Sequence, residues 1–183
     1  MQTEKIILGI DPGTTIMGFG MLCVKQQEMK LLYLDEIHFE RTADHSLRLK
    51  RIFARTLAII DEYKPDELAI EAPFYGKNAQ SMLKLGRAQG VAMAAGLYRE
   101  VPIAEYSPRK IKMAITGNGN AGKRQVAGML QHLLKVKALP ERFDATDGLA
   151  VAVCHHFNAG KPEAQKNYSG WQSFLKENPE RKG

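Results

Sequence analysis

Two apolar, strand-like stretches that lie far apart in the chain each run directly into a carboxylate. Residues 7–10 lead into Asp11, and residues 68–70 lead into Glu71. Continuous apolar runs of this length are typical of buried strands, so each acid is expected at a strand end. If the fold gathers these ends at one rim of a sheet, the two charges repel each other and need a cation nearby.

Asp144 and Asp147 supply two more carboxylates, three positions apart, and so share one face of a predicted helix. Taken singly, each acid has a structural alternative: Asp11 can belong to an Asp-Pro-Gly turn, Glu71 can be a solvated strand exit, and the helical pair can complement the helix dipole. Gathered together, the four form an all-oxygen set that suits hard divalent cations, above all Mg²⁺.

The positive charge of the chain is concentrated in one region. The 183-residue sequence carries a formal net charge of +6 and has a pI of about 9.3. Residues 75–135 contain ten Lys or Arg but only two Glu. Such a regional excess favours a surface that binds a polyanion, although a solvated lysine-rich face has the same composition. Next to an acidic, metal-seeking centre, it indicates a metal-dependent nuclease.

The order of the predicted elements indicates an α/β fold with a mixed five-stranded sheet flanked by helices. Strands are expected at residues 5–10, 17–24, 29–39, 67–71 and 101–106, and helices at 46–63, 78–99, from 108, 122–136 and 141–158. The length suits one domain over residues 1–159. Residues 160–183 are mostly polar and are expected to form a flexible tail.

Periodicity also predicts which helix faces are buried. In helix 46–63 the inward stripe is expected to comprise Leu47, Ile52, Leu57, Ile59 and Ile60. In helix 78–99 three glycines, at positions 86, 90 and 96, lower helix stability and therefore imply tight packing against another element. His155 and His156 lie at a helix end, where surface or dipole roles are expected.

Two glycine-rich segments resemble phosphate-binding loops but lack essential parts. Gly117–Lys123 satisfies GxxxxGK, yet Arg124 stands where a P-loop needs a hydroxyl for Mg²⁺. The segment still suits a DNA phosphate, held by Lys123 and Arg124 at a helix start. Residues 11–15 resemble the first phosphate loop of actin-like ATPases, but the chain is too short for their second lobe.

The remaining features point to a soluble, cytoplasmic protein. The sequence shows no signal-peptide pattern and no uncharged apolar run of about 18 residues. Cys23 and Cys154, the only cysteines, are expected to be buried and reduced.

In combination, these motifs resemble the RuvC-type Holliday-junction resolvases of bacteria. The resemblance covers residues 5–158. It is carried by residues 10–13 with 18–20, 70–71 followed by Phe74, 78–79 with 83–90, 106–112, 117–123 and 144–147.

The resemblance implies an RNase H-like fold, a two-fold homodimer, and Mg²⁺-dependent paired symmetric nicks in four-way DNA junctions during homologous recombination and DNA repair. It assigns catalysis and the binding of two Mg²⁺ ions to Asp11, Glu71, Asp144 and Asp147, with replacement by Mn²⁺ left open. It further implies base stacking by Phe74, DNA contacts from Lys112 and Lys123, and a branch-migration helicase complex of the RuvA and RuvB type as a partner.

Three alternatives remain open at this point. The chain can be another RNase H-like nuclease, such as one that processes ribosomal RNA precursors. It can be a DNA-binding module whose acids are structural, in which case tight binding occurs without divalent-dependent cleavage. A nucleotide-binding protein would instead show affinity for ATP.

Overall fold

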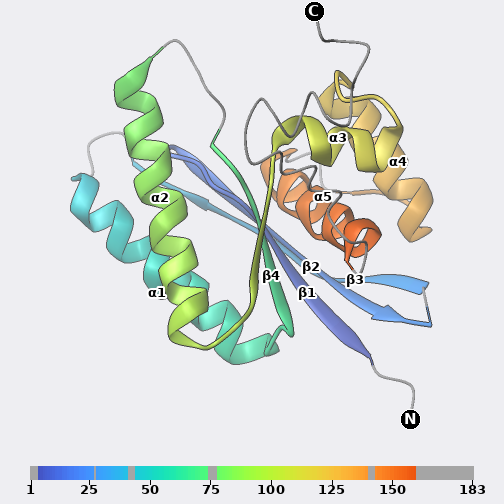
Figure 1. Ribbon diagram of the computed structural model, residues 1–183, viewed down its shortest axis with the longest axis horizontal. Coiled ribbons are helices and arrows are strands. Elements are labelled where there is room, and N and C mark those ends of the chain that lie inside the picture. Colours follow the sequence, from blue (N-terminus) through green and yellow to red (C-terminus); the bar gives the residue numbers. More distant parts are fainter. Residues whose placement is uncertain (1–3, 27, 41–43, 74–77, 140–142, 160–183) are drawn as a thin grey trace, which may run out of the picture.

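A computed structural model describes residues 4–26, 28–40, 44–73, 78–139 and 143–159 (Figure 1). Five strands form one sheet in the order β3-β2-β1-β4-β5. β1 pairs antiparallel with β2, and β2 with β3, whereas β1–β4 and β4–β5 are parallel. The predicted mixed five-stranded sheet is therefore confirmed. The strands are β1 Lys5–Asp11, β2 Ile16–Lys25, β3 Glu28–His38, β4 Glu67–Glu71 and β5 Ile103–Tyr106.

Helices cover both faces of the sheet. Figure 1 shows α1 and α2 on one side, and α3, α4 and α5 on the other. The described residues hold two separate apolar clusters, one under each helical layer. The helices are α1 His45–Tyr63, α2 Ala79–Tyr98, α3 Pro108–Thr116, α4 Lys123–Leu134 and α5 Phe143–Asn158.

Strand alternation decides on which face each strand-end acid lies. In β1, Ile7 belongs to the cluster under α5, whereas Leu8 and Ile10 belong to the cluster under α1 and α2. Because successive side chains point to opposite faces, Asp11 shares the α5 face with Ile7. The same argument places Glu71 on the face of Ala69, which also packs under α5. Both strand-end acids therefore face the helix that carries the other two.

Glycines allow α5 to approach the β1–β2 hairpin closely. A Cβ atom at Gly18 or Gly20 would lie closer than 3.0 Å to the α5 backbone, at Asp144 and Leu149 respectively. Gly9, the cross-strand partner of Gly20, meets the helix in the same way. The first half of α5 can therefore lie directly on the sheet beside the end of β1.

Two packing predictions were only partly correct. Leu47 is 55% exposed, and Thr56 is buried together with Ile52, Ile59 and Ile60. At about 100° per residue, position 47 lies far around the helix from Ile52, so it cannot join the same stripe.

The three glycines of α2 were also expected to meet another element. Gly96 does so, because its Cβ position lies 3.1 Å from Leu68. Gly86 and Gly90 have no neighbour within 4 Å among the described residues. Among the described residues, nothing covers this side of α2 at these two positions.

Cys23 and Cys154 are both buried, as expected. Within the described ranges, no helix combines the length and the apolar character needed to cross a membrane. The boundary between a nuclease domain at 1–159 and a tail at 160–183 stays a prediction, because residues 160–183 lie outside the described part of the chain.

The close contact between α5 and the sheet predicts a strong effect of Gly20→Ala. The added methyl group would overlap the backbone of Leu149 and push α5 away, at a cost of about 3 kcal/mol in the free energy of unfolding. Urea unfolding measures this change. Gly128→Ala, on α4 with no described neighbour within 4 Å, is the matched control and should instead stabilise by about 0.5–1 kcal/mol. Equal stability of the two variants would contradict the close approach.

Candidate active site

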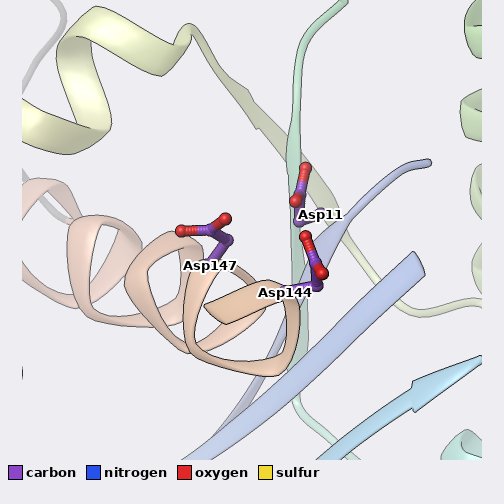
Figure 2. Close-up of side chains that lie close together, drawn as sticks. All are labelled: Asp11, Asp144 and Asp147. Atoms are coloured by element: carbon purple, nitrogen blue, oxygen red, sulfur yellow. The ribbon is translucent and has the colours of Figure 1, made fainter. Parts of the chain in front are cut away.

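Three aspartates from two elements converge at one end of the sheet (Figure 2). Asp11 ends β1, while Asp144 and Asp147 lie in the first turns of α5. Each of the three offers a carboxylate oxygen, and these oxygens all lie within 4.8 Å of one another. Residues separated by more than 130 positions in sequence thus form one compact oxygen cluster.

Glu71 lies beside this group. The parallel register of β1 and β4 ends at Ile10 and Ile70, so the next residues along the two strands are Asp11 and Glu71. Glu71 lines the same cavity of about 220 Å³ as Asp11 and Asp147. The other lining residues are Pro108, Ile111, Lys112, Lys123, Val126 and Ala150.

The acids disturb one another's titration. Burial, followed by the charges of Glu71, Asp147 and Asp144, raises the pKa of Asp11 well above its usual value. Burial and the charge of Asp147 raise the pKa of Glu71 to about 7. Burial is also the main cause that raises the pKa of Asp147. A raised pKa means that the negative charge of these carboxylates is not fully compensated by the surrounding protein. A bound divalent cation would supply the missing positive charge.

Lys123 supplies part of that charge. Its Nζ lies 2.6 Å from Oδ2 of Asp147 and 3.6 Å from Oδ1 of Asp144. Burial works against the charged ammonium, but the hydrogen bond to Asp147 and the charges of Asp147, Asp144 and Asp11 together outweigh it, and the pKa of Lys123 is raised. Lys112 lines the cavity, and its charge lowers the pKa of both Glu71 and Asp147 in part. The site therefore pairs clustered acids with two lysines.

The other predicted site residues are placed differently. Arg124 is exposed on α4 directly after Lys123. Phe74 lies outside the described residues. The segment from Gly117 to Lys123 follows helix α3 rather than a strand. Lys123 forms ion pairs with Asp144 and Asp147. This arrangement agrees with the rejection of a P-loop.

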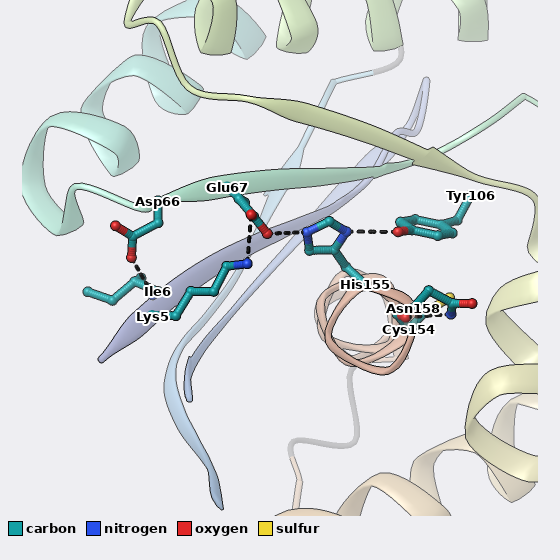
Figure 3. A network of polar contacts seen from close by, with 8 residues as sticks. All are labelled: Lys5, Ile6, Asp66, Glu67, Tyr106, Cys154, His155 and Asn158. Carbon is teal, nitrogen blue, oxygen red and sulfur yellow. Dashed lines mark hydrogen bonds and ion pairs between the residues drawn. The ribbon is translucent and has the colours of Figure 1, made fainter. Parts of the chain in front are cut away.

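Sequence reasoning missed a buried polar network at the other end of α5 (Figure 3). His155 is only 7% exposed, so the expected surface role is wrong. Its Nδ1 lies 2.8 Å from the hydroxyl of Tyr106, and its Nε2 lies 2.5 Å from Oε2 of Glu67. Lys5 Nζ lies 2.6 Å from Oε1 of Glu67. The network fastens α5 to β1, β4 and β5, and no periodic signal in the sequence reveals it.

A second missed residue is Gln89 of α2, which is 6% exposed and donates from Nε2 to the main-chain oxygen of Glu71 at 3.4 Å. A polar residue among apolar ones on one side of the predicted helix 78–99 could have indicated this contact from sequence. Its position links α2 to the strand end that carries Glu71.

Comparison with known proteins identifies the relatives of this chain. A family model described as "Crossover junction endodeoxyribonuclease RuvC" matches residues 7–155. A protein of that name from Christiangramia forsetii is 62% identical over 181 residues, which cover 99% of this chain and 94% of the relative. The Bacteroides fragilis protein of the same name is 59% identical over 180 residues, covering 97% and 96%.

Solved structures agree with the sequence comparison. The structure of Thermus thermophilus RuvC in complex with Holliday junction substrate superposes with a TM-score of 0.76 at 30% identity, covering 85% of this chain and 94% of that one. The yeast mitochondrial Holliday junction resolvase Ydc2 reaches a TM-score of 0.61 at 12% identity, covering 82% and 77%, a likeness in fold alone.

Fold and relatives together define an RNase H-like nuclease. More particularly, the chain belongs to the RuvC family of crossover junction endodeoxyribonucleases.

The raised pKa values predict how the metal-free protein responds to pH. Because the folded-state pKa of Glu71 is about 7, above its usual 4.5, the folded protein binds this proton more tightly than the unfolded chain does. The resulting stability is fully present below about pH 4.5 and is lost as the pH rises through about 7. Asp11 contributes in the same direction.

Asp11→Asn should therefore raise the free energy of unfolding by about 1–2 kcal/mol near pH 8 in EDTA, and by less near pH 5. Urea unfolding across this range measures the difference. Glu40→Gln, at an exposed acid, is the control and should leave the pH profile unchanged. A destabilised Asp11→Asn at the higher pH would contradict the repulsion described above.

Proposed function

We propose that this protein is a Mg²⁺-dependent endonuclease that binds four-way DNA junctions and resolves them by paired symmetric nicks, in homologous recombination and DNA repair. The observation that carries the proposal is the convergence of three aspartates within 4.8 Å, with Glu71 and two lysines beside them. Family membership and the junction-bound T. thermophilus relative support the choice of substrate.

The chemistry of the donor set fits Mg²⁺. All four acids offer hard oxygen ligands. Burial, followed by repulsion from neighbouring carboxylates, raises the pKa values of Asp11, Glu71 and Asp147. Asp11, Glu71, Asp144 and Asp147 would hold two ions. When bound, such ions supply an activated water and neutralise charge on the phosphate and leaving oxygen, leaving 5′-phosphate and 3′-hydroxyl ends.

The lysines act on the DNA phosphates in this proposal. Lys123 pairs with Asp147 and Asp144 and partly neutralises them. A cation bound by these aspartates would weaken that pairing and leave the ammonium available for a phosphate next to the cleavage position. Lys112, which lines the same cavity, would hold the neighbouring backbone, with Arg124 and Phe74 as further DNA contacts.

A homodimer accounts for the pairing of the nicks, because a junction offers two equivalent strands to two identical sites. We place its interface on the outer face of α2. Gly86 and Gly90 meet none of the described residues there, and Leu83 and Leu97 are each 62% exposed on the same helix. By family analogy, a branch-migration helicase complex would deliver the junction to the dimer.

The decisive experiment incubates the protein with a labelled immobile four-way junction, with and without Mg²⁺, and maps the nicks. The expected result is two symmetric nicks that require the metal. Asp11→Asn should bind the junction normally but lower the cleavage rate by at least about 10³-fold. Metal-dependent nicking by Asp11→Asn would contradict the assignment, and preferential cleavage of structured RNA would favour an RNA-processing nuclease.

Lys112→Ala should weaken junction binding and reduce the slope of log K against log salt by about one unit, because one phosphate contact is lost. Fluorescence titration at several salt concentrations, in EDTA, measures the slope. Lys135→Ala, at the far end of α4 and paired with Glu28, is the control and should retain the wild-type slope. Identical slopes for both variants would remove Lys112 from the DNA surface.

A further inference from the structure

The side chain of Gln89 crosses from α2 to the end of β4. It is 6% exposed, and its amide nitrogen donates to the main-chain oxygen of Glu71 at 3.4 Å and to Oε2 of Glu105 at 2.8 Å. Gln89 lies on the α2 side of the sheet, whereas the carboxylate of Glu71 points to the α5 side. Gln89 therefore contacts the backbone of Glu71, a proposed metal ligand, from the face of the sheet opposite the Glu71 carboxylate.

The position of Glu71 in the ladder explains why its carbonyl needs such a donor. In a strand, successive residues direct their backbone polar groups to alternate neighbours. The main-chain N–H groups of Leu68 and Ala72 donate to the β5 side, at Pro102 and Tyr106. The main-chain N–H and C=O of Glu71 are therefore directed towards β1.

β1 cannot supply the expected donor at this point. Continuing the register of Ile10 and Ile70 places Glu71 beside Asp11. In a parallel ladder, the carbonyl of Glu71 would then accept from the residue after Asp11. That residue is Pro12, which has no N–H. The amide of Gln89 takes the place of the missing ladder donor.

We propose that Gln89 is a positioning residue, which holds the end of β4 so that the Glu71 carboxylate stays within reach of the ions bound by the aspartates. The inference rests on the proposed metal-dependent function. α2 contributes no side chain to the described lining of the acidic cavity. Through Gln89, this helix would nevertheless fix the position of Glu71, which lines that cavity. Partners that orient metal ligands typically change metal affinity by about 10–100-fold when removed.

The test compares Gln89→Met, which keeps the length but removes the donor, with Gln89→Lys, which keeps a donor that can reach both oxygens. Calorimetric titration of the full-length, DNA-free protein with Mg²⁺, and with Mn²⁺ followed by electron paramagnetic resonance, measures affinity without relying on activity. Gln89→Met should bind either ion about tenfold more weakly, and Gln89→Lys should recover most of the loss. Junction affinity in EDTA should be the same for both variants and wild type.

Glu105→Ala is the matched control. It removes the other acceptor of Gln89 and leaves the contact with Glu71 in place, so it should retain wild-type metal affinity. An equal loss in Glu105→Ala and Gln89→Met would overturn the inference, and so would wild-type affinity in Gln89→Met. A failure to rescue by Gln89→Lys, with its fold intact by circular dichroism, would also overturn it.

Asp11→Asn separates this inference from the proposed function. If Asp11→Asn abolishes metal binding but Gln89→Met does not weaken it, the role of Gln89 is wrong and the metal site stands. If Asp11→Asn binds both ions like the wild type, the proposed metal site itself is wrong, and the role of Gln89 falls with it.

Discussion

The close contact between α5 and the β1–β2 hairpin is the constraint on which the site depends. Side chains at positions 9, 18 and 20 would hold the helix away from the sheet, since even a methyl group there would overlap its backbone. Because Gly18 is the cross-strand partner of Asp11 and touches the helix at Asp144, the same contact that packs α5 also joins the aspartates. The same helix–sheet contact thus packs the core and brings the acidic side chains together.

This assembly is electrostatically unfavourable in the metal-free protein. Burial and mutual repulsion raise the pKa values of Asp11, Glu71 and Asp147, and Lys123 offsets only part of the charge. The surrounding structure has to hold the acids together. It does so from both faces of the sheet: Gln89 contacts the end of β4 from the α2 side, while His155 anchors the far end of α5 through Tyr106 and Glu67. Because the ionised acids repel one another, these contacts hold the geometry of the cluster.

The placement of the basic groups follows from the same framework. Lys112 on α3 and Lys123 at the start of α4 reach the acidic cavity because both helices pack beside α5. A lysine that neutralises the acids without metal and meets a phosphate with metal would link ion binding to substrate binding. The acidic residues and the basic region that stand out in the sequence therefore both contribute to one site.

The sequence by itself determined the order of strands and helices, the position of two acids at strand ends, and the family. Those features follow from local periodicity and from motifs, which a linear chain displays directly. The absence of described neighbours at Gly86 and Gly90, the burial of His155 and the pairing of Lys123 with Asp147 were decided only by the tertiary structure. Each depends on which distant backbone comes near, and periodicity within one element carries no information about a contact between elements. The four acids could be chosen from sequence, but the distance between them was set by how closely α5 can lie on three glycines.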